Sequence, residues 1–530
     1  MPTGFFSLIL HAHLPFVPYP EHPHLREEET LYQAITEAYL PLIDVISNLH
    51  KSGVAPRITI GVSPLLCEML ADPLRQSLYT GHLENLLSLT EQEIKRTERE
   101  APEFVSAAKM YHEKLNAAWR LWSNQLNHNI LPTLGELQTA DMVEIITSSA
   151  THAVLPLIST VEARRAQVEV AVANYRKHFK QTPRGIWLPG CAYEMGIEEL
   201  LADVGIEYFV TDAQAILYGD PRPRYGIYAP VRCPNGVAVF ARDPQTSQQV
   251  ESSVIGYPSH AAYRDLSTEA PLERLHTHLR GNGERRPLDL KYHRITGRDV
   301  PLADKHPYDP EAARQQTAIH ADRFIGEHTK QIERLRDSLN GRAPLVVAPY
   351  PAELFGHWWF EGIQFLDTVF RQLHLNQQAV AAISLGDYLR SNAAIQIQQP
   401  SSSSCCAEGY FKVWLNEDNA WISPHQQAAE IRMIKLANNY HEPPNEQARR
   451  ALNQAARELL LVQSSDWAFQ LYQGVMPEHA THPFHSHIRS FHWLADAVEH
   501  SAINEDRLSE IEQRDSLFAE LDYRIFKSKQ

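Results

Sequence analysis

Short runs of consecutive apolar residues recur along the first 400 positions of the chain. Each has the length of a single β-strand, and they lie at 5–10, 57–62, 143–146, 185–188, 208–211, 237–240 and 344–348. Segments with apolar residues at helical spacing, such as 30–50 and 198–204, separate several of these runs. Continuous apolar runs are typical of strands buried on both faces of a parallel sheet. The alternation of such strands with helices predicts an α/β fold, a parallel barrel with insertions.

The pattern changes at residues 398–404, where the sequence Gln-Gln-Pro-Ser-Ser-Ser-Ser is polar and has the composition of a linker. Beyond it the strand-like runs fade, and apolar residues follow helical spacing over 426–438, 446–463 and 484–499. We therefore expect two domains. The first is an α/β barrel over residues 1–398, and the second is an α-helical C-terminal domain over residues 405–530.

Composition and charge narrow the function classes. The 530 residues include 64 acidic and 49 basic side chains, a net charge of −15, which disfavours binding to nucleic acid or to anionic membranes. The five cysteines are few and lack the spacing of metal ligands, which is typical of a reducing compartment. The N-terminus lacks the basic start and the cleavage site of a signal peptide, and there is no apolar run long enough to cross a membrane. We expect a cytoplasmic protein.

Polar and aromatic residues gather where the predicted strands end. Three clusters follow the first, third and fourth runs, and they are His11-Ala12-His13, Thr151-His152 and the segment 187–193. A fourth cluster, residues 353–362, follows the last run. The reacting groups of barrel enzymes lie at the C-terminal ends of the strands. We therefore expect the four clusters to share one face of the barrel.

In sequence and order these segments resemble glycoside hydrolase family 57, and in particular its 1,4-α-glucan branching enzymes. The similarity runs through 11–16, 144–152, 187–193 and 348–362, and continues through 414–421 and 463–467 in the C-terminal region. The resemblance implies a (β/α)7 barrel of the family-57 type, followed by an all-α domain that helps to close a glucan cleft. It implies α-1,4-glucan, such as amylose or glycogen-like chains, as the ligand, with no cofactor. It also places the polar segment 241–265 among loops near the cleft, although a solvated surface insertion is the alternative.

The resemblance also indicates where the catalytic carboxyl groups would lie. Family enzymes use a retaining mechanism, in which a carboxylate nucleophile and a carboxyl acid/base lie about 5–5.5 Å apart. At the nucleophile position this chain has Gly190, and at the acid/base position it has Pro351. Neither residue can form a glycosyl ester or exchange a proton, and acid/base catalysis alone contributes about 10²–10⁴-fold. We therefore expect a branching-enzyme homologue without catalytic activity, which binds glucan but does not convert it.

The motif positions that line or border the glucan cleft in the family keep side chains suited to sugar binding. They are His11, His13, His152, Trp187, His357, Trp358, Trp414, Trp421, Asp466 and Trp467. Trp414 and Trp421 are seven residues apart, so on a helix they would share one face. Each of these residues also has an ordinary alternative role as a packed or hydrogen-bonded residue.

Two active alternatives remain open from the sequence. An α-glucan branching enzyme, transglycosidase or hydrolase could use relocated carboxylates, with Glu194 and Glu353 as the candidates. Alternatively, His11 and His13 project to one side of a strand end and could hold a metal ion together with His152 and Asp212. A metal-bound water would then supply the nucleophile of a hydrolase. The sequence identifies no protein partner.

Overall fold

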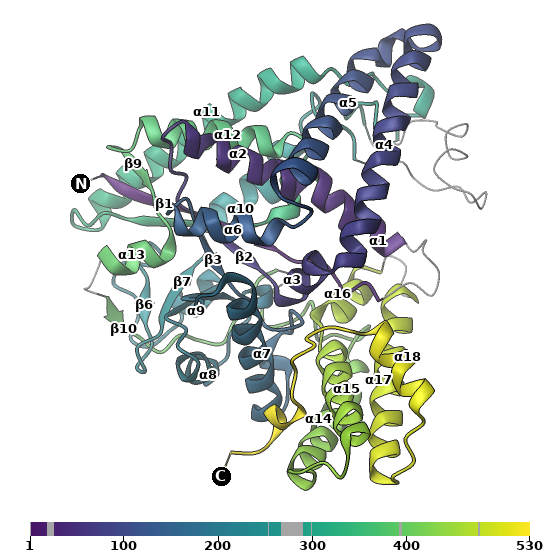
Figure 1. Ribbon diagram of the computed structural model, residues 1–530. Helices are drawn as coiled ribbons and strands as arrows, with labels where there is room; N and C mark the ends of the chain where they lie inside the picture. The colour runs from purple at the N-terminus through teal and green to yellow at the C-terminus, as the bar shows by residue number, and fades with distance from the viewer. Residues whose placement is uncertain are drawn as a thin grey trace.

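The fold is a barrel with a helical bundle beside it, as Figure 1 shows. The computed structural model describes residues 2–18, 26–252, 254–266, 290–297, 299–391, 395–406, 408–474 and 478–529. The barrel occupies the purple to green part of the chain, and the bundle is the yellow-green to yellow part. Among the described residues, none of the helices combines the length and the apolarity that crossing a lipid bilayer requires.

Seven parallel strands form the barrel in the described part of the chain. They are β1 (Gly4–Ala12), β2 (Ile58–Val62), β3 (Val143–Ile146), β4 (Gly185–Trp187), β5 (Tyr208–Thr211), β7 (Ala238–Ala241) and β8 (Leu345–Pro351). Pairing runs β3-β2-β1-β8 in one sheet and β4-β5-β7 in the other. A bridge between Thr147 and Ile186 joins β3 to β4, and the Asp243 N–H donates to the Val347 carbonyl at 2.8 Å between β7 and β8. The predicted (β/α)7 barrel is confirmed.

Three short strands extend these sheets. β6 (Val231–Arg232) pairs antiparallel with β7, and β10 (Gln396–Ile397) pairs with β6. β9 (Val380–Ala382) lies beside the beginning of β1. The barrel strands themselves are almost wholly buried, as β2 and β5 show along their whole length. Burial on both faces explains why their sequences read as continuous apolar runs.

Helices surround the barrel and form its largest insertion. Between β1 and β3 they are α1 (Arg26–Gln33), a π-helical turn (Ala34–Tyr39), α2 (Leu40–Lys51), α3 (Pro64–Ala71), α4 (Pro73–Glu100), α5 (Val105–Arg120) and α6 (Ile130–Thr139). The later ones are α7 (Val161–Phe179), α8 (Ile197–Asp203), α9 (Ala213–Leu217), α10 (Pro244–Glu251), α11 (Pro310–Ser338), α12 (Gly362–Leu375) and α13 (Leu385–Ser391). α4 and α5 form a hairpin that projects from the barrel in Figure 1. α4 ends just before Pro102, because proline cannot continue the hydrogen-bond ladder of a helix.

The C-terminal region is helical, as predicted. It contains α14 (Ile422–Asn439), α15 (Glu446–Val462), α16 (Ser465–Gln473), α17 (Glu478–Glu499) and α18 (Glu505–Arg514). α15 is amphipathic at its start and buried throughout its second half, where it packs against α17. α16 lies at the side of the bundle that faces the barrel, as Figure 1 shows.

The serine-rich stretch is not a linker, so that interpretation of residues 398–404 is wrong. Gln398 and Ser403 are fully buried. Ser403 pairs antiparallel with Tyr193, and the Gln398 amide donates to the Ile216 and Pro221 carbonyls. Polar residues can be buried where hydrogen bonds hold them in place, even though Gln398 Oε1 has no partner among the described residues. Composition alone does not distinguish this case from a solvated linker. The domain bounds 1–398 and 405–530 remain a prediction.

The segment between this stretch and α14 is irregular, so Trp414 and Trp421 do not share a helix face. Tyr410 and Phe411 have φ angles of 48° and 69°, in the left-handed region that a continuous helix of L-residues avoids. Trp414 lies in a turn, and α14 begins only after Trp421. Both rings pack against the main core, and Trp414 also packs against the buried cluster that contains Trp187 and Cys191.

Candidate functional site

His11 connects the ends of three strands. It lies near the end of β1, in register with Pro351 at the end of β8. Its imidazole stacks on the indole of Trp187, the last residue of β4, with ring centroids 4.3 Å apart and planes 9° apart. Burial lowers the pKa of His11 to about 3, so the ring is neutral at physiological pH. A neutral imidazole offers one donor and one acceptor nitrogen.

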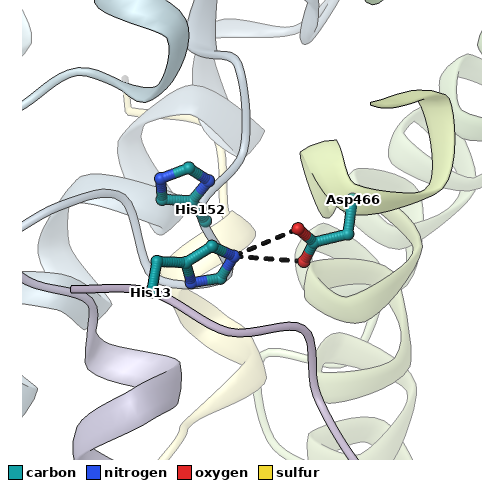
Figure 2. Close-up of side chains that lie close together, drawn as sticks. All are labelled: His13, His152 and Asp466. Carbon is teal, nitrogen blue, oxygen red and sulfur yellow. Dashed lines mark hydrogen bonds and ion pairs between the residues drawn. The ribbon is translucent and has the colours of Figure 1, made fainter. Parts of the chain in front are cut away.

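His13, His152 and Asp466 meet where the barrel contacts α16 (Figure 2). His13 Nε2 lies 3.2 Å from both carboxylate oxygens of Asp466, and His13 Nδ1 lies 2.9 Å from the Ser63 hydroxyl. The rings of His13 and His152 are stacked, with centroids 3.7 Å apart. His152 Nδ1 bonds the Ser465 hydroxyl at 3.0 Å. The first turn of α16 therefore docks on two histidines of the barrel.

His152 keeps one nitrogen without a partner. Its Nε2 is buried and has no hydrogen bond among the described residues. Burial is the main cause that lowers the pKa of His152, and the nearby imidazoles of His13 and His11 add to it. A buried polar nitrogen without a partner is costly unless a ligand or water satisfies it. This nitrogen is therefore a place where a polar ligand group would be stabilised.

The arrangement does not fit the metal centre that the sequence left open. His13, His152 and Asp466 each offer a ligand atom within 4.8 Å of the others. However, the lone pair of an imidazole nitrogen lies in the ring plane, and the two stacked planes are only 9° from parallel, so both rings cannot direct a lone pair at one ion. Asp212 is instead held by Arg242, with 2.9 Å between carboxylate and guanidinium. The set of His11, His13, His152 and Asp212 is not brought together.

Gly190 adopts a conformation that leaves no room for a side chain. Its φ angle is 63°, in the left-handed region. A Cβ atom built there would lie 2.1 Å from Cη2 of Trp414, and a further two ring atoms would lie within 2.7 Å. The Cys405 N–H also donates to the Gly190 carbonyl at 2.7 Å, which fixes the segment that carries Trp414. The Trp414 ring thus occupies the space where a side chain at position 190 would begin.

Pro351 ends β8, and the next carboxylate along the chain is already used by the fold. Glu353 is buried, and its Oε1 accepts hydrogen bonds from the Tyr39 hydroxyl at 2.5 Å and the His13 N–H at 3.2 Å. Burial raises the pKa of Glu353. Glu194, by contrast, is nearly half exposed and pairs with Arg164 at 3.6 Å. The two carboxylates of the relocated-pair alternative face different partners on different elements.

A buried ion pair holds the loop that follows β8. Glu37, in the π-helical turn, bonds His357 Nδ1 at 2.7 Å and Arg264 at 2.8 Å. Arg264 also donates to the His357 carbonyl at 3.1 Å. Of the tandem tryptophans, Trp358 is 47% exposed, whereas Trp359 is fully buried. The loop therefore presents Trp358 to solvent while its base is fixed.

Sequence reasoning missed Glu37 and Arg264. The π-helical turn around Glu37 has no local sequence signal, and Arg264 lies in the polar segment 241–265 that the sequence left as a cover or a surface insertion. In the described part of that segment, Arg242, Asp243 and Arg264 make buried or partly buried contacts, so the segment is not simply a solvated insertion. A charged pair far apart in sequence becomes visible only in the fold.

The remaining predicted rings lie deeper. Trp187 and Trp467 are 5% and 3% exposed, and the Trp467 indole N–H donates to the Leu461 carbonyl at 2.8 Å. Trp421 is partly buried and stacks on His485 of α17 with ring centroids 5.4 Å apart. These contacts favour packing roles for Trp467 and Trp421. Trp358 is the predicted aromatic that is most open to a ligand.

Comparison with known proteins identifies the family. The model of glycosyl hydrolase family 57 matches residues 7–398, and that of the C-terminal region of 1,4-alpha-glucan branching enzymes matches residues 425–526. A 1,4-alpha-glucan branching enzyme of Thermococcus kodakarensis is 34% identical over 551 residues, which cover 97% of this chain and 77% of the relative. Its crystal structure, in complex with glucose and additives, matches with a TM-score of 0.89 at 31% identity, covering 100% of this chain and 97% of that one.

A second solved relative has a different named activity. The crystal structure of the alpha-amylase AmyC from Thermotoga maritima matches with a TM-score of 0.92 at 35% identity and covers 99% of both chains. Similar folds in this group thus have different reactions in their names, so the fold alone does not determine the activity. The match of both regions, barrel and helical bundle, does determine the family. This chain belongs to glycosyl hydrolase family 57, with a C-terminal region of the branching-enzyme type.

Proposed function

We propose that this chain binds α-1,4-glucan at the face where the ends of β1, β4 and β8 meet α16, and that it neither cleaves nor transfers the glucan. Neutral imidazoles, the Asp466 carboxylate and the exposed Trp358 ring are groups that suit sugar hydroxyls and the apolar faces of sugars. The glucose complex of the Thermococcus relative supports a saccharide ligand. A cytoplasmic location is part of this proposal.

The observation that carries the inactive half of the proposal is the contact between Gly190 and Trp414. The glycine at the nucleophile position comes with a second change, because an indole ring fills the space that a carboxylate side chain would need. Pro351, at the proposed acid/base position, has no titratable group. Glu353 and Glu194 are held by other partners, so neither is poised to replace the missing pair. Without a carboxylate pair, neither step of a retaining mechanism has its catalyst.

The test incubates the purified chain with amylose and follows iodine absorbance and reducing ends, while a glycogen-containing gel measures retardation. We expect no change in iodine absorbance or in reducing ends, together with clear retardation in the gel. A change in either amylose signal would overturn the inactive half of the proposal. Normal migration in the glycogen gel would overturn the binding half.

A set of restored variants separates missing catalysts from a deformed site. Gly190→Glu with Pro351→Asp restores the two carboxylates but leaves Trp414 in the space of the first. We therefore expect this double variant to remain inactive. Adding Trp414→Ala removes the obstruction, and any activity that returns should appear only in this triple variant. If the double variant is already active without Trp414→Ala, the indole does not block position 190.

A further inference from the structure

Three of the five cysteines gather beside Gly190. Cys191 follows Gly190 in the chain. Tyr193 pairs antiparallel with Ser403, so two residues further along the two segments Cys191 lies opposite Cys405. Cys191 and Cys405 belong to one buried cluster of side chains, and the sulfurs of Cys405 and Cys406 are 2.8 Å apart. The Arg242 guanidinium acts electrostatically on all three thiols. This group is called the thiol cluster below.

The cluster has an outlet to solvent. Cys406 is exposed, whereas Cys405 and Cys191 are buried, at 9% and 1% exposure. Cys406 has a φ angle of 68°, which turns the chain sharply at the exposed end. Trp414 packs against the hydrophobic cluster that contains Cys191 and Cys405. A reagent in solvent thus meets Cys406 first, and the two thiols behind it lie against the ring that fills position 190.

We propose that the thiol cluster is a site of reversible oxidation by hydroperoxides, at which Cys406 is oxidised and Cys405 forms a disulfide with it. The proposal does not depend on glucan binding. Transient disulfides in reducing compartments are typically redox-sensing. Neighbouring cysteines have Cα atoms about 3.8 Å apart, below the 4.4–6.8 Å that disulfides prefer, so such a bond is strained and easily reduced.

The chemistry balances with a hydroperoxide as the oxidant. The Cys406 thiolate attacks one peroxide oxygen, an S–O bond forms, the O–O bond breaks, and the leaving hydroxide takes up a proton as water. Cys405 then attacks the sulfenic sulfur of Cys406, an S–S bond forms, and the S–O bond breaks with loss of a second water. Two thiols and hydrogen peroxide thus give one disulfide and two waters. A cellular thiol reverses the step by exchange.

Cys191 gives the oxidised cluster a second arrangement. Its sulfur can attack Cys405 in the Cys405–Cys406 disulfide, and Cys406 then leaves as a thiol with the proton from Cys191. This exchange transfers no net electrons. It replaces a strained bond between neighbours by one between residues that face each other across two segments. The exchanged form would link Cys191, which follows Gly190, to Cys405, whose N–H donates to the Gly190 carbonyl.

The groups around Cys406 control its pKa, and with it the rate of the first oxidation step. Hydrogen bonding to Cys405 and burial raise the pKa of Cys406, and Glu251 adds to this, while Arg242 opposes it. Hydrogen bonding to Cys191 is the main cause of the raised pKa of Cys405. Because the thiolate is the reactive form, we expect slow oxidation at pH 7 that accelerates by about tenfold for each pH unit up to pH 9.

The experiment treats the full chain with hydrogen peroxide at pH 8.5, blocks the remaining thiols with an alkylating reagent, and maps tryptic peptides by mass spectrometry. Cys191 and the pair Cys405-Cys406 fall in different tryptic peptides, because Arg184, Arg390 and Lys412 are cleavage sites. A Cys405–Cys406 disulfide makes one peptide lighter by two hydrogens, and a Cys191–Cys405 disulfide joins two peptides. We expect one of these products, with Cys67 and Cys233 alkylated.

Three variants make the result specific. Cys405→Ser should abolish both disulfides, and Cys191→Ser should leave only the disulfide between neighbours. The matched control Cys67→Ala removes a buried cysteine outside the cluster and should oxidise as the native chain does. The proposal is overturned if the three thiols remain alkylatable, or if Cys406 proceeds to sulfinic acid without a disulfide. It is also overturned if Cys405→Ser loses as many thiols as the native chain.

Discussion

The Trp414 ring occupies the space that a side chain at position 190 would need, so two segments more than 200 residues apart in sequence lie in contact. A glycine with a φ angle of 63° tolerates no β-carbon without strain, and here the Trp414 ring adds a steric obstacle. Gly53 offers a comparison, because it has a φ angle of 72° with no atom within 4 Å of a built Cβ. The two glycines separate backbone strain from overpacking.

We predict that Gly190→Ala lowers the free energy of unfolding by about 2–4 kcal/mol, combining left-handed strain with overpacking. In a Trp414→Ala background the same change should cost only about 1–2 kcal/mol, because the backbone strain alone remains. Gly53→Ala should cost about 1–2 kcal/mol in both backgrounds. Urea unfolding followed by circular dichroism measures all of these values. Equal costs of Gly190→Ala in both backgrounds would show that the indole does not fill this space.

Trp358 is the ring whose contribution to ligand binding can be measured without disturbing the core. Because it is 47% exposed, Trp358→Ala should leave the fold intact. We expect a loss of about 1–3 kcal/mol in glucan binding, which is about 5- to 150-fold in Kd. Isothermal calorimetry with maltoheptaose gives the value. Tyr218→Ala, at an exposed aromatic outside the predicted site, is the control and should bind as the native chain does.

The helices α15 and α17 are joined by a buried ionic cluster. His487 Nδ1 lies 2.8 Å from the Glu458 carboxylate and 3.6 Å from that of Asp515, and all three side chains are buried. Burial and the Asp515 carboxylate raise the pKa of Glu458 from 4.5 to about 7. Burial lowers the pKa of His487, but the two carboxylates outweigh it and raise the pKa above 6.5.

Both raised pKa values mean that the folded state holds its protons to higher pH than the unfolded state does. The stabilisation from Glu458 is therefore complete below pH 4.5 and is lost as the pH rises through about 7. We predict that the free energy of unfolding falls by more than about 1 kcal/mol between pH 6 and pH 8. Urea unfolding at several pH values measures this slope. Glu458→Gln should flatten it, and an unchanged slope in that variant would exclude Glu458 as its source.

Regular elements were predictable because their signals are local. The structure has β3 at Val143–Ile146 and β5 at Tyr208–Thr211, the same bounds as two of the predicted runs. The error at 398–404 has a different cause, because Gln398 and Ser403 are buried through hydrogen bonds to segments far away in sequence. The spacing of seven residues would put Trp414 and Trp421 on one face only if the segment were helical, and the positive φ angles of Tyr410 and Phe411 show that the segment just before Trp414 is not.

Glu430 binds the helical bundle to the barrel. One of its carboxylate oxygens accepts four hydrogen bonds, from the backbone N–H groups and the hydroxyls of Ser159 and Thr160, at 2.6–3.1 Å. Glu430 lies on α14 and is almost fully buried. The donors Ser159 and Thr160 directly precede α7 of the barrel. This contact and the His13–Asp466 contact both join the bundle to the barrel.

Glu430→Ala should destabilise the protein by about 2–4 kcal/mol, because buried donors lose a charged acceptor. We also expect the bundle to unfold before the barrel, as a separate transition in differential scanning calorimetry. Glu430→Gln keeps an oxygen acceptor and should lose less than half as much. A single unshifted transition in Glu430→Ala would show that this contact does not join the two regions.

Contacts across this interface also explain why the candidate site was only partly predictable. The sequence motifs identified His13, His152 and Asp466 one by one. The stacking joins two rings from different strand ends, and the contacts of these rings with α16 join residues more than 300 positions apart. No local pattern predicts such geometry. The same holds for the contact of Trp414 with Gly190, in which the indole fills the space that a side chain at position 190 would need.

Proton NMR of the native chain mixed with maltoheptaose tests glucan binding and turnover in one sample. Saturation-transfer difference signals report binding, while the anomeric protons of reducing ends and of α-1,6 linkages report cleavage and branching in the same sample. We predict saturation transfer to glucan protons and no new anomeric signals over several days. New reducing-end or α-1,6 signals would contradict the absence of turnover, and a lack of saturation transfer would contradict glucan binding.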